Sequence, residues 1–367
     1  MITPLLLIIA TLYPLLVQLA LPRTRWIIIG LHVLLLFAIG MQQGILSGKE
    51  ALKYTGCAYE VLHGDFHDIT GNYVKYGAYV IFLLPFVAIG KAWLAVVAQV
   101  LIGILAADAL ARSTERITGN IGLGRLAMAL FLLCPLIQTW TLALYTEHFF
   151  TCIIILFLER LDRHPCVDWI TLLFAVIALF ARPVGLFFVV PALLWKFTSR
   201  SAPSQRWGLI TIGVLLVFAF ALYVPRIAPA QLAPIASGQI IAGIGGMDAA
   251  AFNGRTIGDA QNHLINKVGA AQWLEITARR MLSLFTLTKP HFSTAHNTVN
   301  AFFYFLFPLA LWGSVQWMKE PRVRLILLLL LTNALLVGLT HDEWSGRFLV
   351  PLLPWVMTLA CIGLQKR

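Results

Sequence analysis

The stretch that decides the fold is residues 47–85, SGKEALKYTGCAYEVLHGDFHDITGNYVKYGAYVIFLLP. Its first part, from Glu50 to about Leu62, has apolar residues at helical spacing and predicts an amphipathic helix that lies on a membrane surface. The stretch leads into the apolar segment 76–90, which at about 15 residues is short for a membrane crossing. We interpret this segment as a juxtamembrane or re-entrant helix.

Longer apolar segments recur along the chain. It has 367 residues, of which 59% are hydrophobic and 12% are charged, and its mean hydropathy is +0.83. A soluble domain carries about twice that charged fraction. We therefore predict an all-α polytopic membrane protein, with 1–367 forming a single transmembrane domain of about 11 transmembrane helices. The predicted spans lie near 3–21, 26–44, 92–111, 126–144, 147–160, 167–181, 185–197, 207–224, 299–318, 323–340 and 348–364.

The basic residues predict the orientation, because they concentrate in cytoplasmic loops. The basic loops of this chain fall on one side only if segment 76–90 does not cross; they carry Arg23/Arg25, Arg112/Arg116/Arg125, Arg160/Arg163, Lys196/Arg200/Arg206, Lys319/Arg322/Arg324 and Lys366/Arg367. The first extracytoplasmic loop, 45–91, and a large loop, 225–298, then face outward. The formal net charge of +11 indicates loop topology and contact with anionic membrane lipids rather than nucleic-acid binding.

Two glutamates stand at the predicted outer boundary. Glu50 lies where the chain leaves the bilayer, so it is either a functional carboxylate or a solvated one that the helix dipole favours. Glu147 lies between two strongly apolar helices, so it either faces a cavity or is an interfacial turn residue. Both are candidate site residues.

Four basic side chains are candidates for binding a phosphate group. Arg347, at the mouth of the last helix, can fork onto a phosphate or extend to lipid headgroups, and Asp342 and Glu343 are close enough in sequence to neutralise it. The other three are Lys289 and His291, before the span at 299, and Arg182 in the polar break ARPVG at 181–185. Lys289 is alternatively an interface anchor, and Arg182 is alternatively the cap of a helix hairpin.

Known metal and catalytic motifs do not occur in the chain. HExxH, Walker A, GxSxG and zinc-type Cys/His spacings are absent, and the five cysteines are scattered. His291 and His296 are not at i,i+4 spacing, so they give only a weak indication of a metal site. Metal binding is therefore left open.

The order of these features resembles the GT-C superfamily of integral membrane glycosyltransferases, especially the bacterial enzymes similar to aminoarabinose transferases and dolichyl-phosphate-mannose-type mannosyltransferases. The resemblance rests on Glu50-Ala51-Leu52-Lys53-Tyr54, followed by Gly64-Asp65-Phe66, on Thr146-Glu147, on the ARPVG break and on the closing GRFLVPLLPW. The family acid in the first loop is usually Asp, whereas here it is Glu. That departure leaves Asp65 and Asp68 as rival bases.

The resemblance implies an inverting transferase at the outer face of a bacterial inner (plasma) membrane. It would move a sugar from a polyprenyl-phosphate donor to a hydroxyl of a glycan, glycolipid or protein. Glu50 would be the general base, Arg347 with Lys289 or Arg182 would bind the departing phosphate, and Tyr54 and His291 would line the site. Glu147 would orient the acceptor or, with Glu50, hold a divalent cation.

Three alternatives stay open. A lipid-linked-sugar flippase would need a polar path, whereas the predicted spans are almost free of charge. An O-antigen-ligase-like transferase in a polysaccharide pathway would also use a lipid-linked donor. A non-enzymatic scaffold would not need acids and phosphate-binding cations on one face.

Overall fold

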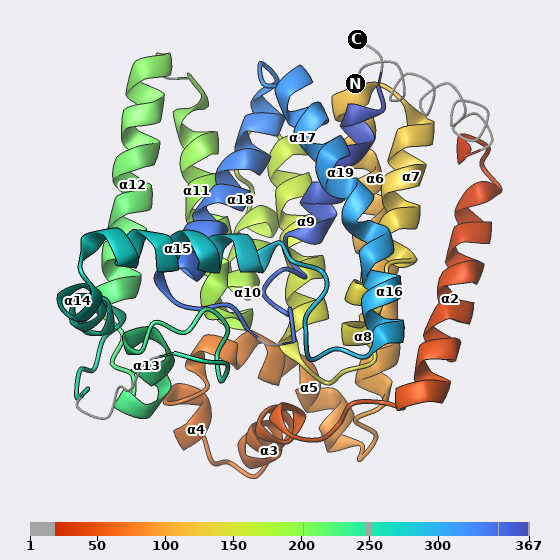
Figure 1. Ribbon diagram of the computed structural model, residues 1–367. Helices are drawn as coiled ribbons and strands as arrows, with labels where there is room; N and C mark the ends of the chain where they lie inside the picture. The colour runs from red at the N-terminus through yellow and green to blue at the C-terminus, as the bar shows by residue number, and fades with distance from the viewer. Residues whose placement is uncertain (1–18, 201, 247–251, 344, 366–367) are drawn as a thin grey trace. The chain divides into compact units, whose positions relative to one another are not determined.

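The computed structural model describes residues 19–200, 202–246, 252–343 and 345–365. Every regular element in these residues is a helix, and β-type pairing is limited to isolated bridges (Figure 1). The predicted all-α fold is therefore confirmed for this part of the chain, whereas most of the predicted span 3–21 lies outside it.

Among the described helices, five are long and apolar enough to cross a membrane. They are α2 (Thr24–Gln43), α6 (Leu94–Thr118), α12 (Pro203–Tyr223), α18 (Pro321–Leu339) and the stretch Thr294–Gln316, which contains α16 (Thr294–Phe302), η4 (Phe303–Phe305) and α17 (Leu306–Gln316). The pair α7 (Ile121–Leu132) and α8 (Pro135–Thr141), bent by 58°, is a sixth candidate. The helical membrane character predicted from hydropathy agrees with these lengths.

The remaining predicted spans are shorter in the structure. Three of them have 11 to 13 residues: α10 (Trp169–Ala181), α11 (Leu186–Phe197) and α19 (Leu353–Gly363). A fourth, α9 (Thr146–Arg163), has 18 residues but carries charged residues in its first and last turns. The break η2 (Pro183–Gly185) separates α10 from α11 because proline removes a helical hydrogen bond. A total of about 11 crossings stays a prediction.

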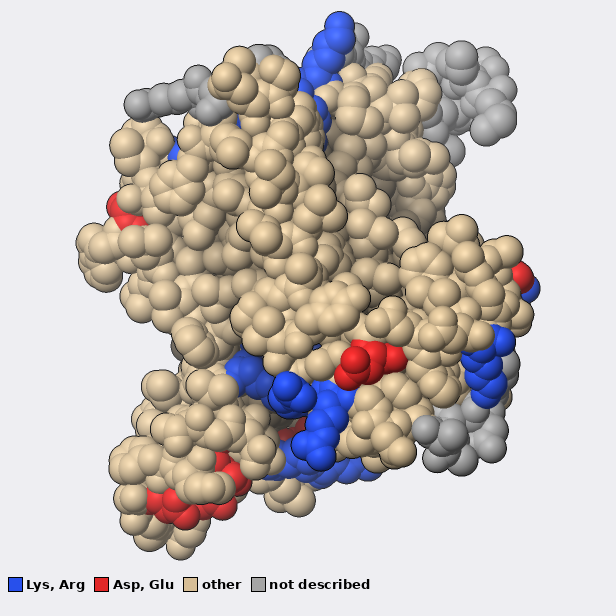
Figure 2. Space-filling model, turned by 90° about the vertical axis from the view of Figure 1, so that its left-hand side faces the viewer, with Lys and Arg blue, Asp and Glu red and all other residues tan. Residues whose placement is uncertain are grey.

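The chain forms two compact units, each built from separate stretches. Unit 1 comprises 1–185, 302–324 and 350–367, and unit 2 comprises 186–301 and 325–349. The face in Figure 2 is largely uncharged, and its Lys, Arg, Asp and Glu side chains gather in a few places. An uncharged surface of that kind is expected where helices contact lipid.

In unit 1, the first loop folds into α3 (Glu50–Leu62), α4 (His67–Thr70), η1 (Val74–Tyr76) and α5 (Gly77–Ala88). The amphipathic helix predicted from Glu50 to about Leu62 is confirmed by α3. At about 1.5 Å per residue, the 12 residues of α5 span only about 18 Å, which is less than a hydrocarbon core. This helix packs against α3 and α10.

The buried helix α19 packs closely on α17 in the same unit. A Cβ atom on Gly313 would lie 2.2 Å from the carbonyl oxygen of Leu359, and one on Gly363 would lie 2.3 Å from that of Leu309. Only glycine permits this approach of two backbones, as in the small-residue packing of membrane helices. This close packing keeps α19, which is too short to cross a bilayer, in the interior of the protein.

Unit 2 contains most of the predicted large loop. That segment folds into α13 (Pro229–Ala236), α14 (Ile257–Val268) and α15 (Ala270–Leu284). A capping box between Thr256 and Asp259 begins α14. Helix α15 runs across α18, where a Cβ on Gly338 would meet Met281 at 2.8 Å (Figure 1).

Candidate functional site

A short parallel bridge in unit 1 brings the start of the first loop beside the start of α9. The amide of Leu46 donates to the carbonyl of Leu142 at 2.9 Å, and the amide of Leu144 donates back to Leu46 at 3.0 Å. The hydroxyl of Tyr145 donates to the carbonyl of Gly48 at 3.3 Å. Glu50 follows the bridge by a few residues in one segment, and Glu147 follows it by a few residues in the other. The two candidate acids therefore come from adjoining segments.

Glu147 forms a buried ion pair with Arg182. The Oε1 atom of Glu147, in the first turn of α9, lies 3.0 Å from Nη1 of Arg182, at the end of α10. The two side chains are 2% and 9% exposed, respectively. That Nη1 makes no hydrogen bond of good geometry among the described residues, so its contact with Glu147 is an ion pair. The positive end of the α9 dipole also favours the carboxylate.

Tyr54 interacts electrostatically with this ion pair. It is buried on α3, and its electrostatic partners include Glu147, Glu50 and Arg182. Burial, followed by the charges of Tyr76, Glu147 and Glu50, raises its pKa well above the usual value near 10. The phenol therefore stays protonated and can act as a hydrogen-bond donor.

The residue before Glu50 has an unusual backbone. Lys49, which precedes α3, has φ +52° and ψ −113°. Side chains other than glycine rarely adopt positive φ, and such conformations concentrate at functional sites. Glu50 itself is half-buried.

A polar network positions the residues behind the ion pair. The hydroxyl of Tyr79 donates to Oε1 of Gln99 at 3.2 Å, and Nε2 of Gln99 donates to the carbonyls of Thr141 and Ala143 at 3.0 Å. The hydroxyl of Thr141 lies 2.9 Å from Nδ1 of His148. These bonds satisfy the carbonyls of Thr141 and Ala143 at the end of α8. They also hold His148, the residue that follows Glu147, in place. We did not predict a role for Gln99, although an amide inside an apolar span is a usable signal.

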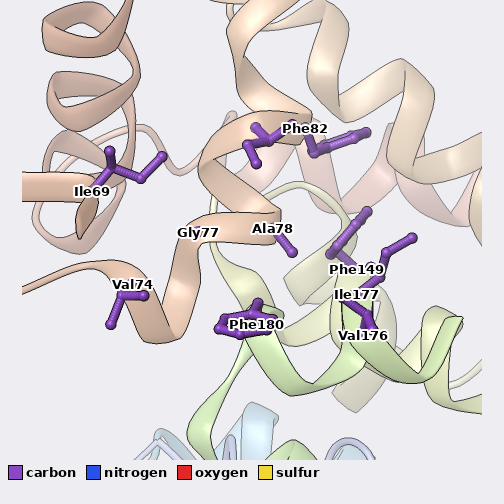
Figure 3. Close-up of a pocket in the computed structure, with 10 residues that line it drawn as sticks. Ile69, Val74, Gly77, Ala78, Phe82, Phe149, Val176, Ile177 and Phe180 are labelled. Atoms are coloured by element: carbon purple, nitrogen blue, oxygen red, sulfur yellow. The ribbon is translucent and has the colours of Figure 1, made fainter. Parts of the chain in front are cut away.

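An apolar groove of about 500 Å³ opens between segments of unit 1 that include the helices carrying the ion pair (Figure 3). It lies between α4–α5 on one side and α9–α10 on the other, and is lined by Ile69, Val74, Gly77, Ala78, Ile81, Phe82, Phe149, Val176, Ile177 and Phe180. Phe149 follows Glu147 by two residues, and Phe180 precedes Arg182 by two. The groove therefore lies within about one helical turn of the two charges.

The rival acids Asp65 and Asp68 make local contacts on the loop after α3. Asp65 accepts from the amide of His67 at 2.9 Å, and a carboxylate oxygen of Asp68 lies 3.5 Å from Nδ1 of the same histidine. Burial, followed by the charges of Glu60, Asp68 and Asp65, raises the pKa of Cys57 to about 11. The two acids thus gather near Cys57, whereas Glu50 interacts with Tyr54.

In unit 2, Lys289 and Asp342 form a second buried ion pair. Nζ of Lys289 lies 2.5 Å from Oδ2 of Asp342, and the side chains are 2% and 1% exposed, respectively. Ser283 donates to the same oxygen at 3.0 Å. Binding of a phosphate by Lys289 would require this pair to open.

The other predicted cations of this unit lie at its loops. Glu343 lies 3.6 Å from Nε of Arg347, so one of the two acids expected to neutralise that arginine does so, while Asp342 pairs with Lys289 instead. His291 is exposed and packs edge-on against Phe292.

Arg280 is a buried cation that the sequence analysis did not single out. It is fully buried on α15, where Nε donates to the carbonyl of Gln239 at 2.7 Å and Nη2 donates to Ile235 at 3.2 Å. Burial lowers its pKa to about 10. Its position four residues after Ile276 and four before Leu284, on the apolar face of the helix, is the signal that could have found it. It stabilises the carboxyl end of α13.

The donor set does not fit a metal centre. No group of three or more His, Cys, Asp and Glu side chains gathers at one point in the described ranges, and the charge of Glu147 is matched by Arg182.

The fold and this site define the protein's class as a helical membrane protein with a buried charge pair beside an apolar groove. Comparison with family models, with curated proteins and with solved structures gives no match in any of the three.

Proposed function

We propose that the protein is an inverting glycosyltransferase that moves a sugar from a polyprenyl-phosphate donor to an acceptor hydroxyl. One observation carries the proposal: the open apolar groove is lined by Phe149 and Phe180, each two residues along the chain from a member of the buried Glu147–Arg182 pair. Such a site suits a ligand that is apolar along its length and anionic at its head. A polyprenyl phosphate has this composition.

The donor would place its isoprenoid tail in the groove and its phosphate on Arg182. The incoming phosphate would compete with Glu147 for the guanidinium, since both are anions. Tyr54, which stays protonated, would donate a hydrogen bond to a phosphate oxygen or to the sugar. The arginine would then stabilise the charge that develops on the phosphate as it departs.

Transfer would be a single displacement. The acceptor oxygen forms a bond to the anomeric carbon while the bond from that carbon to the phosphate oxygen breaks, and the hydroxyl proton passes to Glu50. Attack opposite the leaving group inverts the anomeric configuration. Polyprenyl phosphate leaves as the anion, so no general acid is required.

The proposal includes the membrane topology expected from the basic loops. About 11 crossings would place the first loop and α3 at the outer face of a bacterial plasma membrane, where lipid-linked donors of cell-envelope polysaccharides are displayed. The acceptor would be a glycan, a glycolipid or a protein. Lipid-linked donors are thereby available without leaving the bilayer.

The test is transfer by purified protein in liposomes that contain a panel of polyprenyl-phosphate sugars. We expect Glu50→Gln to lower turnover by at least about 100-fold, the usual effect of losing a general base. Its matched control, Asp65→Asn, should keep turnover near wild type, and both variants should elute as the wild type does on size exclusion. Full activity in Glu50→Gln would refute the assignment of the base. Movement of the donor across the bilayer without product would favour a flippase.

A further inference from the structure

Three arginines from three helices surround one carboxylate in unit 1. Asp108, on α6, lies 3.5 Å from Nε of Arg25 on α2 and 3.6 Å from Nη1 of Arg125 on α7, and it also bonds Nη1 of Arg112 on its own helix. Of these three contacts, the one with Arg112 is a hydrogen bond, and the other two are longer ion pairs. One negative charge is thus shared by three guanidinium groups.

The neighbouring acids are engaged elsewhere. Glu159 lies 3.0 Å from Arg116 and 3.4 Å from Arg112, whereas Asp162 lies 3.0 Å from Arg116 and 2.7 Å from Arg322. Within this network the cations are Arg25, Arg112, Arg116, Arg125 and Arg322, and the anions are Asp108, Glu159, Asp162 and Glu320. Five positive charges face four negative ones, and the excess lies at Asp108.

Neither Glu115 nor the segment that precedes α2 supplies a negative charge to balance the excess of positive charge at Asp108. Glu115 lies on α6 against Gly124 of α7, but it takes part in none of the ion pairs within 4.0 Å that the described residues form. Residues 1–18, which precede α2, contain no Asp or Glu. An anion from outside the chain is therefore the natural complement of the cluster.

Two of the arginines are accessible, and one of them has a nitrogen that makes no hydrogen bond with the described residues. The Nε atom of Arg25 is buried and has no hydrogen-bond partner in the part of the chain that the structure describes. The side chains of Arg25 and Arg112 are nevertheless 36% and 44% exposed, respectively, so an anion can reach their guanidinium groups. The first turn of α2 contains no acidic residue, and its dipole adds to the positive field.

The surroundings select a lipid rather than a small soluble anion. Beyond Arg25, α2 exposes large apolar side chains, including Trp26, Ile27, Leu34 and Phe37, and the whole helix is apolar enough to cross a membrane. A basic cluster between membrane helices, continued by an apolar surface, matches a phosphate headgroup with its acyl chains. We propose that Arg25, Arg112 and Arg125 bind the phosphate of an anionic phospholipid, which holds α2 against α6 and α7.

This site is separate from the proposed catalytic one. Nε2 of His148, on α9, lies 3.2 Å from the carbonyl of Gln99 on α6, while Glu159 on α9 pairs with Arg112 on α6. The separation of 13 positions between Gln99 and Arg112 corresponds to about 20 Å of helix. The lipid would thus bind at the other end of the α6–α9 pair and would not depend on the transferase proposal.

The experiment is native mass spectrometry of the purified full chain, titrated with phosphatidylglycerol or with phosphatidylcholine. We expect the wild type to retain phosphatidylglycerol selectively. The variant Arg25→Gln/Arg125→Gln should bind it about ten- to thirty-fold more weakly, the effect of losing two basic contacts. The control Arg163→Gln/Lys319→Gln removes the same charge from exposed positions and should bind as the wild type does.

A second variant guards against misfolding of the first. Asp108→Asn removes the carboxylate that competes for the arginines, so it should bind phosphatidylglycerol as tightly as the wild type or more tightly. Unchanged binding by Arg25→Gln/Arg125→Gln, or weaker binding by Asp108→Asn, would overturn the proposal. Equal retention of both lipids would also overturn it, as would displacement of the lipid by inorganic phosphate at the same concentration, which would indicate a site for a free anion.

Discussion

Glu147 and Arg182 lie at the ends of two successive helices of unit 1, with Oε1 and Nη1 3.0 Å apart and both side chains more than 90% buried. The pair joins the start of α9 to the end of α10 beside an apolar groove. Two buried charges are costly to desolvate unless they compensate each other. Each member of the pair therefore compensates the buried charge of the other.

Removing one partner of this pair tests its structural role. Arg182→Met leaves the Glu147 carboxylate buried without a counter-charge, so the free energy of unfolding should fall by about 3–5 kcal/mol. Glu147→Gln/Arg182→Met should recover most of the loss, because no charge stays buried. Denaturant unfolding in detergent measures both.

The control for that comparison is an exposed pair. Arg279 and Glu275 are 66% and 56% exposed, respectively, so Arg279→Met should change the free energy of unfolding by less than about 1 kcal/mol. If Arg182→Met were as mild as Arg279→Met, burial would not be what makes the first pair important.

Filling the groove tests its role as a tail site. Ala78 lines the groove in the first turn of α5, and Ala78→Phe should raise KM for a long-chain polyprenyl-phosphate donor by about ten-fold through lost tail contacts. Ala88→Phe, at the exposed end of the same helix, should leave KM unchanged. Activity assays with donors of different chain length would check this. An effect of Ala78→Phe that is equal for short and long chains would contradict it.

Alkaline pH tests the environment of Tyr54. Its pKa in the folded protein is raised above the value near 10 expected when unfolded, first by burial and then by Tyr76, Glu147 and Glu50. The stability that depends on the neutral phenol is thus complete below about pH 10. It is lost as the pH rises toward the folded-state pKa, because the unfolded chain releases its proton first.

Tyr54→Phe removes that titration, so the melting temperature should fall less steeply above pH 10 than in the wild type. Tyr59→Phe, at an exposed position of the same helix, is the control and should leave the slope unchanged. Parallel slopes for Tyr54→Phe and the wild type would show that Tyr54 ionises as an ordinary tyrosine.

Variants of the buried Lys289–Asp342 pair distinguish a structural role of Lys289 from a role in binding substrate. Lys289→Met should lower the free energy of unfolding by about 3 kcal/mol by leaving Asp342 buried and charged, and Lys289→Met/Asp342→Asn should restore much of it. If Lys289 acts only in this pair, the double variant keeps the wild-type KM for the donor. A stable double variant with a much higher KM would instead assign Lys289 to phosphate binding.

Much of the helical framework follows from hydropathy and periodicity. The amphipathic helix from Glu50 to Leu62, the short apolar α5 and the long span at 92–111 were readable, because each depends on the spacing of residues close together in the chain. Composition likewise indicates a membrane protein, since so few charges cannot cover a soluble surface. The candidates Glu50, Glu147 and Arg182 were found from their positions at the ends of apolar segments.

Tertiary structure alone decided which of these groups meet. Glu147 pairs with Arg182, 35 residues away, while Asp342 takes Lys289 rather than the nearby Arg347 as its partner. The groove needs side chains from α4, α5, α9 and α10 at once. Local patterns report the environment that a residue prefers, whereas an ion pair or a groove depends on the packing of distant segments. The sequence by itself therefore determined a helical membrane chain with candidate acids and cations, and the packing decided how they combine into a site.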